Sequence, residues 1–249
     1  MHTKKNVCDN ILNTLLGMDG KSKDNLNSRL DLEEMNIRPE LHPVKINDTE
    51  WEIPMVVFNL TNEEKTIFCK VFHDLQVPDG YGSNIARNVK LKERKFIGLK
   101  SHDCHMIMQQ LLPIALRRST KPKVTSVLID ICKYFNDICS KTINVEHMEK
   151  LEKDIVITLC NMEKLFPPSF FTIMMHLVVH LASEAKVAGP VQYRWMYPIE
   201  RYLLTLKNYV RTRSHPEGSI AEGYLAEESL TFCSLFLHNV ETKSKLIRH

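Results

Sequence analysis

Apolar residues recur at helical spacing along most of the chain, and this pattern constrains the fold more than any other feature. Residues 6–16 show it first, and the segments 124–141, 145–166 and 169–185 keep it for three turns or more. No stretch of the sequence shows the sustained alternation of apolar and polar residues that indicates a half-buried strand. The pattern predicts a mainly α protein.

Capping residues and prolines predict where helices begin, break and end. Thr61 followed three residues later by Glu64 has the spacing of a capping box, so a helix should begin there. The turn-rich string at 17–25 should end the first helix and cap a short second one. Pro113 lies inside an apolar segment and should kink or split its helix, because proline lacks the backbone N–H and crowds the preceding turn.

A proline-rich stretch suggests how the chain is divided. Residues 38–58 hold three prolines and show no period, so we expect an extended segment that crosses the fold near the N-terminus. The expected division is then residues 1–45, a linker with a short helix over 46–84, and a helical domain over 85–249.

Composition excludes several classes of function. Lys and Arg number 33 against 30 Asp and Glu, so any affinity for nucleic acid must come from local clustering. The 7 cysteines are scattered without a framework spacing, which favours free thiols in a reducing compartment.

The sequence has no apolar run of bilayer or signal-peptide length, so we expect an intracellular protein with no membrane partner. With 8 glycines and no P-loop, GxGxxG or GxSxG string, a nucleotide-binding enzyme, a hydrolase or a small-molecule substrate is disfavoured.

The string PVQYRWMYPIERYLLTLKNYVRTR, residues 190–213, combines aromatic and basic residues. Pro198 suits the first turn of an amphipathic helix and places Glu200 near its N-terminus, where the helix dipole favours a negative charge. Basic residues beside exposed aromatic ones can grip phosphate and stack on bases. The candidate nucleic-acid-binding residues are Arg194, Arg201, Lys207, Arg211 and Arg213. The alternative is a solvated helix face with Glu200 as an ordinary first-turn acid.

Two histidine pairs are candidates for a metal site. His176 and His180 are four positions apart, so on a helix both rings project from one face. His102 and His105 are three positions apart in the string SHDCH. Two closely spaced pairs separated by a long insert match the ligand number and spacing of a four-ligand structural zinc site. The alternative for His176 and His180, whose neighbours are very apolar, is a pair of hydrogen-bonded core histidines.

Four long strings point to one family. They are residues 1–41 (MHTKKNVCDNILNTLL and onward), 98–117 (GLKSHDCHMIMQQLLPIALR), 165–185 (LFPPSFFTIMMHLVVHLASEA) and 189–229 (GPVQYRWMYPIERYLLTLKNYVRTR and onward). In order and wording they resemble the C-terminal part of plant CACTA (En/Spm-type) transposases, including the DUF4218-like domain of unknown function that follows the core. The resemblance implies a helical domain from the C-terminal half of an RNase H-like transposase, with residues 1–45 as the end of the core.

The resemblance also implies a chemistry. In such cut-and-paste transposases three carboxylates hold two magnesium ions that activate water and then a DNA 3′-hydroxyl. The family's first acids lie upstream of the string that opens this chain, so we expect an incomplete site and no enzymatic activity; magnesium would belong only to a complete transposase. In related transposases a histidine pair helps to bind zinc shortly before the last catalytic glutamate. Glu200 is 20 residues after His180 and is the candidate vestigial acid, with Glu184, Glu222 and Glu227 as alternatives.

Two functions of different classes remain open at this point. The first is a transposon-derived fragment, resident in the nucleus, that binds DNA such as transposon ends and possesses no complete catalytic site. The second is a regulatory helical module that binds an intact transposase or another protein without touching DNA. A non-functional remnant is a third possibility.

Overall fold

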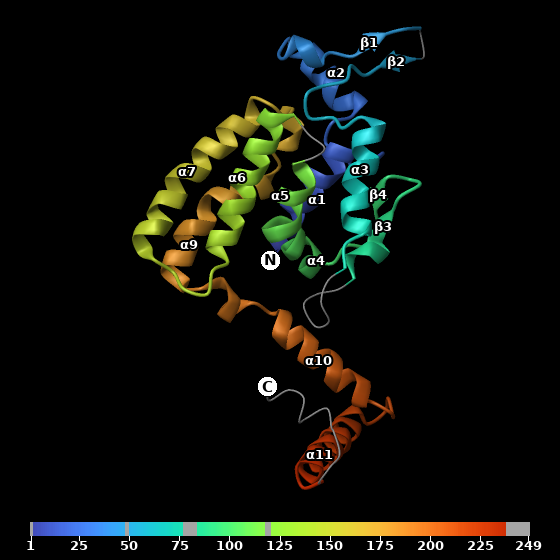
Figure 1. Cartoon of the computed structure of the whole chain (residues 1–249), viewed down its shortest axis with the longest axis vertical. Helices are drawn as coiled ribbons and strands as arrows, with labels where there is room; N and C mark the ends of the chain where they lie inside the picture. Colours follow the sequence, from blue (N-terminus) through green and yellow to red (C-terminus); the bar gives the residue numbers. More distant parts are fainter. Residues whose placement is uncertain (1, 48–49, 77–83, 118–120, 238–249) are drawn as a thin grey trace. The chain divides into compact units, whose positions relative to one another are not determined.

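The computed structural model describes residues 2–47, 50–76, 84–117 and 121–237, and it is mainly α-helical, which confirms the predicted fold class (Figure 1). The chain forms two compact units, Met1–Tyr193 and Arg194–His249. The expected boundaries after residues 45 and 84 both lie inside the first unit. The division into three segments of different evolutionary origin stays a prediction, because segments that pack into one compact unit can differ in origin.

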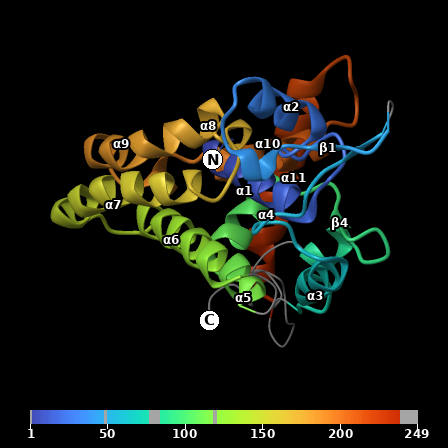
Figure 2. The same cartoon turned by 90° about the horizontal axis from the view of Figure 1, so that it is seen from above.

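Nine α-helices in the described part of the first unit build its core. They are α1 (His2–Leu16), α2 (Leu26–Glu34), α3 (Asn62–His73), α4 (Ser101–Met106), α5 (Leu112–Leu116), α6 (Pro122–Ile138), α7 (Val145–Glu163), α8 (Ile173–His176) and α9 (Leu181–Ala188). Helix α1 contacts α4 and α8, α6 packs on α7, and α7 packs on α9. Figures 1 and 2 show α6, α7 and α9 side by side, with α1 between this group and α3.

Capping explains where two of these helices begin. The Thr61 hydroxyl accepts the Glu64 N–H at 3.2 Å while the Glu64 carboxylate accepts the Thr61 N–H at 2.8 Å, so the predicted capping box is confirmed at the start of α3. Asn25 and Ser28 form a second capping box at the start of α2. Each box satisfies two backbone donors that a helix start would otherwise leave unpaired.

Pro113 breaks its helix as predicted, and the structure shows how. A π-helical turn, Ile107–Leu111, separates α4 from α5, and the Leu112 N–H donates to the Ile107 carbonyl five residues back. Pro113 then occupies the first turn of α5, where its missing N–H is tolerated. The wider turn therefore keeps the apolar side chains on the core side without requiring a hydrogen bond from proline.

The prediction of one continuous helix over residues 169–185 is wrong. The segment begins as a 3-10 turn, Pro168–Phe170, forms the short α8, tightens into a 3-10 turn over Leu177–His180, and continues as α9. The Tyr134 hydroxyl donates to the Val178 carbonyl at 2.7 Å, inside the tightened turn. A side chain that takes a carbonyl from the helical ladder perturbs the helix at that point.

Two small antiparallel hairpins, which the periodicity did not predict, complete the first unit. Strand β1 (Val44–Lys45) pairs with β2 (Trp51–Glu52), and β3 (Val89–Lys90) pairs with β4 (Lys95–Phe96). Strands of two residues are too short to show alternation in the sequence. The expected extended segment over 38–58 thus folds back on itself in part.

One buried arginine fastens the β1–β2 segment to α2. The Arg29 side chain is fully buried, and its guanidinium donates to both oxygens of the Asp24 carboxylate at 2.6 and 2.8 Å. Its remaining terminal nitrogen donates to the carbonyls of Leu41 and Pro54, on either side of the hairpin. The bidentate pair supplies the counter-charge that a buried guanidinium requires.

The second unit contains two described helices, α10 (Tyr197–Tyr209) and α11 (Pro216–Leu235). Pro198 lies in the first turn of α10, as predicted. The helices meet near the connection between them, where a methyl group added at Gly223 would lie 2.7 Å from the Tyr209 side chain. They diverge from that point (Figure 1). No residue of α11 is buried, and every described side chain of α10 is at least partly exposed.

Candidate nucleic-acid interface and histidine pair

All of the residues predicted to bind nucleic acid are exposed and lie in the second unit. Arg194 ends a 3-10 turn, two residues belong to α10, and two follow it in the connection to α11; the set is Arg194, Arg201, Lys207, Arg211 and Arg213. Over residues 194–213 these five cations face a single acid, Glu200, so the segment has a net charge of +4. The chain as a whole has only +3, so positive charge is concentrated here.

The five cations do not line one face of α10. Arg201 and Lys207 are six residues apart, which places them about 120° apart around a helix. Arg211 and Arg213 lie beyond the last turn. Charges spread in this way suit contact with a phosphate backbone, which follows charge density, better than they suit a pocket for one anion.

The aromatic residues near these cations are only partly available. Tyr193 is 77% exposed, but it ends the first unit. Trp195 is half-buried in the second unit. The Tyr197 side chain lies outside the described part of the structure. Base stacking therefore has little support, and the five exposed cations carry the interpretation.

Glu200 occupies the first-turn position that the sequence around Pro198 predicted. It lies exposed in the first turn of α10, and its N–H donates to the Met196 carbonyl at 2.7 Å. The alternative acids Glu184, Glu222 and Glu227 are also exposed, on α9 and α11. In the described residues no three acids, histidines or cysteines converge in a way that could hold a metal ion. Glu200 is thus placed as a first-turn acid, and its role as the third acid stays a prediction.

His176 and His180 form a close pair on the protein surface. Their Nε2 atoms are 3.3 Å apart, and the rings meet edge to face with centroids 5.1 Å apart. Both side chains are exposed, so the alternative of core histidines is wrong. The apolar neighbours Met175 and Val178 point into the core instead and leave the histidines on the opposite side.

The second predicted pair has a different environment. The buried Lys4 ammonium donates to His105 Nδ1 at 2.9 Å and lies 3.8 Å from Cys139 Sγ. Burial, reinforced by the neighbouring Lys4 charge, lowers the pKa of His105 to about 3, and burial lowers the pKa of Lys4 to about 8. His105 is therefore neutral at pH 7, and one of its ring nitrogens is engaged by Lys4.

The predicted four-histidine site is not formed. Because no three possible ligands converge within the described ranges, His102 and His105 do not join His176 and His180 around one point. The reason is the path of the chain: His105 faces Lys4 of α1, and the other pair lies at the junction of α8 and α9. Two of the four residues fit zinc, since two nitrogens bound to one tetrahedral zinc lie about 3.3 Å apart.

Sequence reasoning missed Lys4 as a partner of His105, although one signal was present. Lys4 shares a helical face with Cys8, Ile11 and Leu15, at spacings of four, seven and eleven residues. That face is buried. A cation on the apolar side of a helix must find a partner, but no local rule names one 101 residues away.

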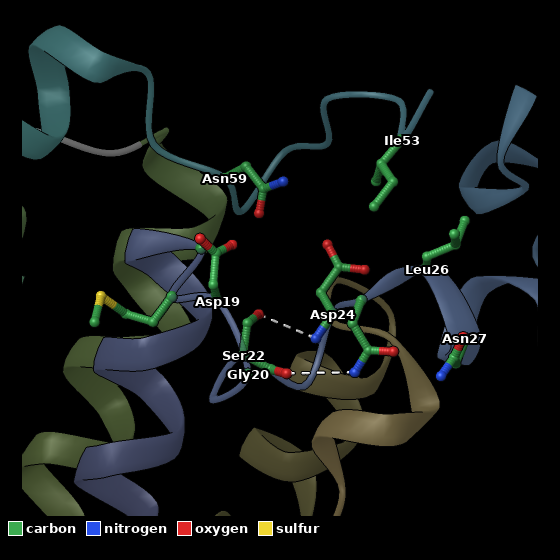
Figure 3. A pocket seen from close by; sticks show the side chains of 11 residues that line it. Asp19, Gly20, Ser22, Asp24, Leu26, Asn27, Ile53 and Asn59 are labelled. Atoms are coloured by element: carbon green, nitrogen blue, oxygen red, sulfur yellow. Dashed lines mark hydrogen bonds between the residues drawn. The ribbon is translucent and has the colours of Figure 1, made fainter. Parts of the chain in front are cut away.

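A polar hollow of about 590 Å³ opens between the end of α1 and the start of α2, and it was also not predicted (Figure 3). Asp19, Asn27 and Asn59 line it together with Asp24, whose carboxylate already pairs with Arg29. Acids and amide groups on these walls disfavour a phosphate ligand. The hollow is thus separate in chemistry from the basic segment 194–213.

The structure also shows the state of the cysteines and the character of the long helices. All seven cysteines are free; Cys8, Cys69, Cys104 and Cys132 are buried as small apolar groups. Among the helices of the described residues none is both long and apolar enough to cross a lipid bilayer.

Comparison with known proteins gives one match, to a family model that covers the C-terminal part of the chain. Residues 138–249, just under half of the chain, match the model of a domain of unknown function, DUF4218. The match begins at the last residue of α6 and runs through α10 and α11. No curated protein and no solved structure gives a significant match. The fold thus defines a mainly α protein, and its C-terminal part is similar to DUF4218.

Proposed function

We propose that this chain is a transposon-derived protein, a C-terminal fragment of a CACTA-type transposase, that binds DNA through its second unit. The observation that carries the proposal is the exposure of five cations within residues 194–213, with Glu200 as the only acid among them. The sequence resemblance and the DUF4218 match over residues 138–249 support the transposase origin.

The proposed mode of binding follows from the charge distribution. Cations released from DNA when Lys or Arg side chains neutralise phosphates supply a binding free energy that does not depend on base sequence. The segment 194–213 carries this charge, while 216–237 has four glutamates and no Lys or Arg. DNA should therefore contact the α10 side of the second unit and avoid α11. The ends of a transposon are the proposed natural ligand, and a DNA ligand implies residence in the nucleus.

We infer no strand-cleaving or strand-joining activity for this polypeptide alone. Phosphoryl transfer by two metal ions needs several carboxylates that share the ions. Glu200 is the proposed vestigial third acid, and it faces solvent in the first turn of α10. One carboxylate does not hold two magnesium ions, so the role that we assign to the chain is binding.

Zinc, if bound, would have a structural role at the histidine pair. The proposed ligands are His176 Nε2 and His180 Nε2, whose separation of 3.3 Å suits one tetrahedral ion. When bound, zinc would crosslink the α8–α9 junction. His102 and His105 are not included in this revised site.

The second candidate function, a protein-interaction module, is favoured by a different observation. Helix α11 exposes large apolar side chains such as Leu230 and Phe232, which DNA would not cover. The two functions differ in their test: DNA affinity that falls steeply with salt supports the first, and absence of DNA binding at low salt supports the second.

A further inference from the structure

The large apolar residues of helix α11 are spread around its circumference and do not form a single stripe. Large exposed apolar residues occur from its middle to its end and continue just beyond it; in the helix they are Tyr224, Leu225, Leu230, Phe232 and Leu235, and Phe236 and Leu237 follow. Leu230 is 71% exposed, and the Phe232 ring contacts the Phe236 ring in a tilted arrangement, with ring centroids 5.0 Å apart. A helix that carries large apolar residues on several sides normally buries many of them. Contact with α10 near Gly223 covers only the first part of α11.

The charges of α11 restrict what can cover it. Over residues 216–237 the charged residues are Glu217, Glu222, Glu227 and Glu228, so this segment has a net charge of −4. A partner surface that is apolar and edged by cations would match it. A lipid surface that carries negative charge would be repelled.

Helix α10 has the matching surface. Its apolar stripe includes Ile199, Tyr202 and Leu203, and each of these side chains is about half exposed. Lys207 borders this stripe, and the segment 194–213 has the opposite net charge, +4. The divergence of α10 and α11 within one copy leaves the stripe at the start of α10 uncovered by α11 (Figure 1).

The exposed apolar area is large enough for a stable interface. Twelve large apolar residues of the second unit, from Met196 to Leu237, are exposed among those that the structure describes. At about half exposure each, they present on the order of 1,000 Å² per copy, and a standard interface buries about 800 Å² per partner.

We propose that two copies of this chain associate through their second units, with α10 of each copy packed on α11 of the other. The arrangement is reciprocal, as a two-fold interface requires, because each copy contributes one basic and one acidic helix. The four helices then form a small bundle in which basic and acidic elements alternate. Apolar burial provides the stability, and the charges fix the pairing.

The test is the mass of the full chain in solution, measured by light scattering during size-exclusion chromatography. The unaltered chain, 28.9 kDa as a monomer, should elute with twice that mass at about 10 μM. Leu225→Glu with Phe232→Glu should give a monomer. The matched control Ile157→Glu with Ile173→Glu alters exposed residues of the first unit, 61% and 66% exposed, and should remain dimeric. A monomeric unaltered chain, or a dimer that tolerates the α11 changes, overturns the proposal.

Reversing the charges of α10 or α11 tests whether the molecule that covers α11 is a second copy of this chain. One variant carries Glu222→Lys, Glu227→Lys and Glu228→Lys; the other carries Arg201→Glu, Lys207→Glu and Arg211→Glu. Each should be mainly monomeric alone, because its two helices then bear the same sign, and a mixture should recover a heterodimer. Circular dichroism of each variant checks that its helices persist. If the variants keep their helices but the mixture stays monomeric, α10 and α11 do not pair between copies. None of these measurements contains DNA, so their outcome is independent of the proposed DNA binding.

Discussion

Lys4 Nζ lies 2.9 Å from His105 Nδ1, across 101 residues of sequence, in a buried part of the first unit. The contact joins α1 to α4 and also brings Lys4 to Cys139 at the end of α6. Since the Lys4 cation is buried and its nearest polar neighbours are neutral, the first unit holds a positive charge that a rise in pH would remove. This relationship gives a prediction for stability against pH.

Replacement of Lys4 by methionine should change how stability depends on pH. The pKa of Lys4 is about 8 in the folded protein against 10.5 as its ordinary value, so between these two values the unfolded chain binds more protons. The unaltered protein therefore gains stability as pH rises through this window, and Lys4→Met does not. The difference in unfolding free energy between them should shift by up to about 3 kcal/mol in favour of the unaltered protein.

Urea unfolding at several pH values from neutral to alkaline measures this shift. Lys5→Met is the matched control, because Lys5 pairs with Asp9 at 2.6 Å and its pKa is raised. The stability that Lys5 contributes is present at neutral pH and is lost as pH rises through its folded pKa, so this control should move in the opposite direction. Parallel curves for Lys4→Met and the unaltered protein would contradict the assignment of a buried charge.

Arg29 should be one of the most sensitive positions in the first unit. Arg29→Met should destabilise the protein by about 3 to 5 kcal/mol, because it leaves the buried Asp24 carboxylate, 4% exposed, without its partner. The double change Arg29→Met with Asp24→Leu should be milder than Arg29→Met alone, since no charge is then stranded. Chemical denaturation of the three variants measures this order. Equal stability of Arg29→Met and the unaltered protein would show that the pair does not fasten the hairpin.

The histidine pair predicts a change on addition of zinc. Zinc at 100 times its dissociation constant should raise the unfolding free energy by about 2.7 kcal/mol, and His176→Ala with His180→Ala should abolish the effect. The matched control removes two other exposed histidines, His73 and His147, and should retain it. Thermal unfolding with and without zinc or a chelator gives the readout. A zinc response that survives loss of His176 and His180 would place the ion elsewhere.

The proposed absence of catalytic activity has a direct test. The purified chain, incubated with a labelled transposon-end duplex and Mg²⁺ or Mn²⁺, should neither nick nor join the DNA, because one proposed acid does not hold two ions. Denaturing gel electrophoresis of the labelled strand detects a single cleavage. Products that depend on the metal and vanish in Glu200→Gln would show that the chain is an enzyme.

Local signals predicted much of the fold. The capping box at Thr61 and Glu64, the break at Pro113 and the first-turn position of Glu200 were readable because each depends on residues within one or two helical turns. Features that depend on distant partners were not readable. The tightened turn at Leu177–His180 follows from a bond to Tyr134, 44 residues away from Val178.

The candidate sites also combine features that local spacing predicts with features that depend on distant packing. The spacing of His176 and His180 predicted their pairing, since four residues bring two side chains together on one helical turn. The spacing did not predict their exposure, which depends on how α8 and α9 pack. Whether His102 and His105 would join them depended on the path of the whole chain, and the partner of His105 proved to be Lys4.

The central claim is that residues 194–213 bind the phosphate backbone, and the salt dependence of DNA affinity tests it most directly. Fluorescence anisotropy with a labelled duplex should give a slope of log affinity against log salt of about −4.5 for five contacts. In the triple variant Arg201→Ala, Lys207→Ala, Arg211→Ala the size of this slope should fall by about 3. The matched control Lys141→Ala, Lys150→Ala, Lys153→Ala removes the same charge from the surface of the first unit and should keep the slope. Equal slopes for the two triple variants, or no binding at low salt, would contradict the claim.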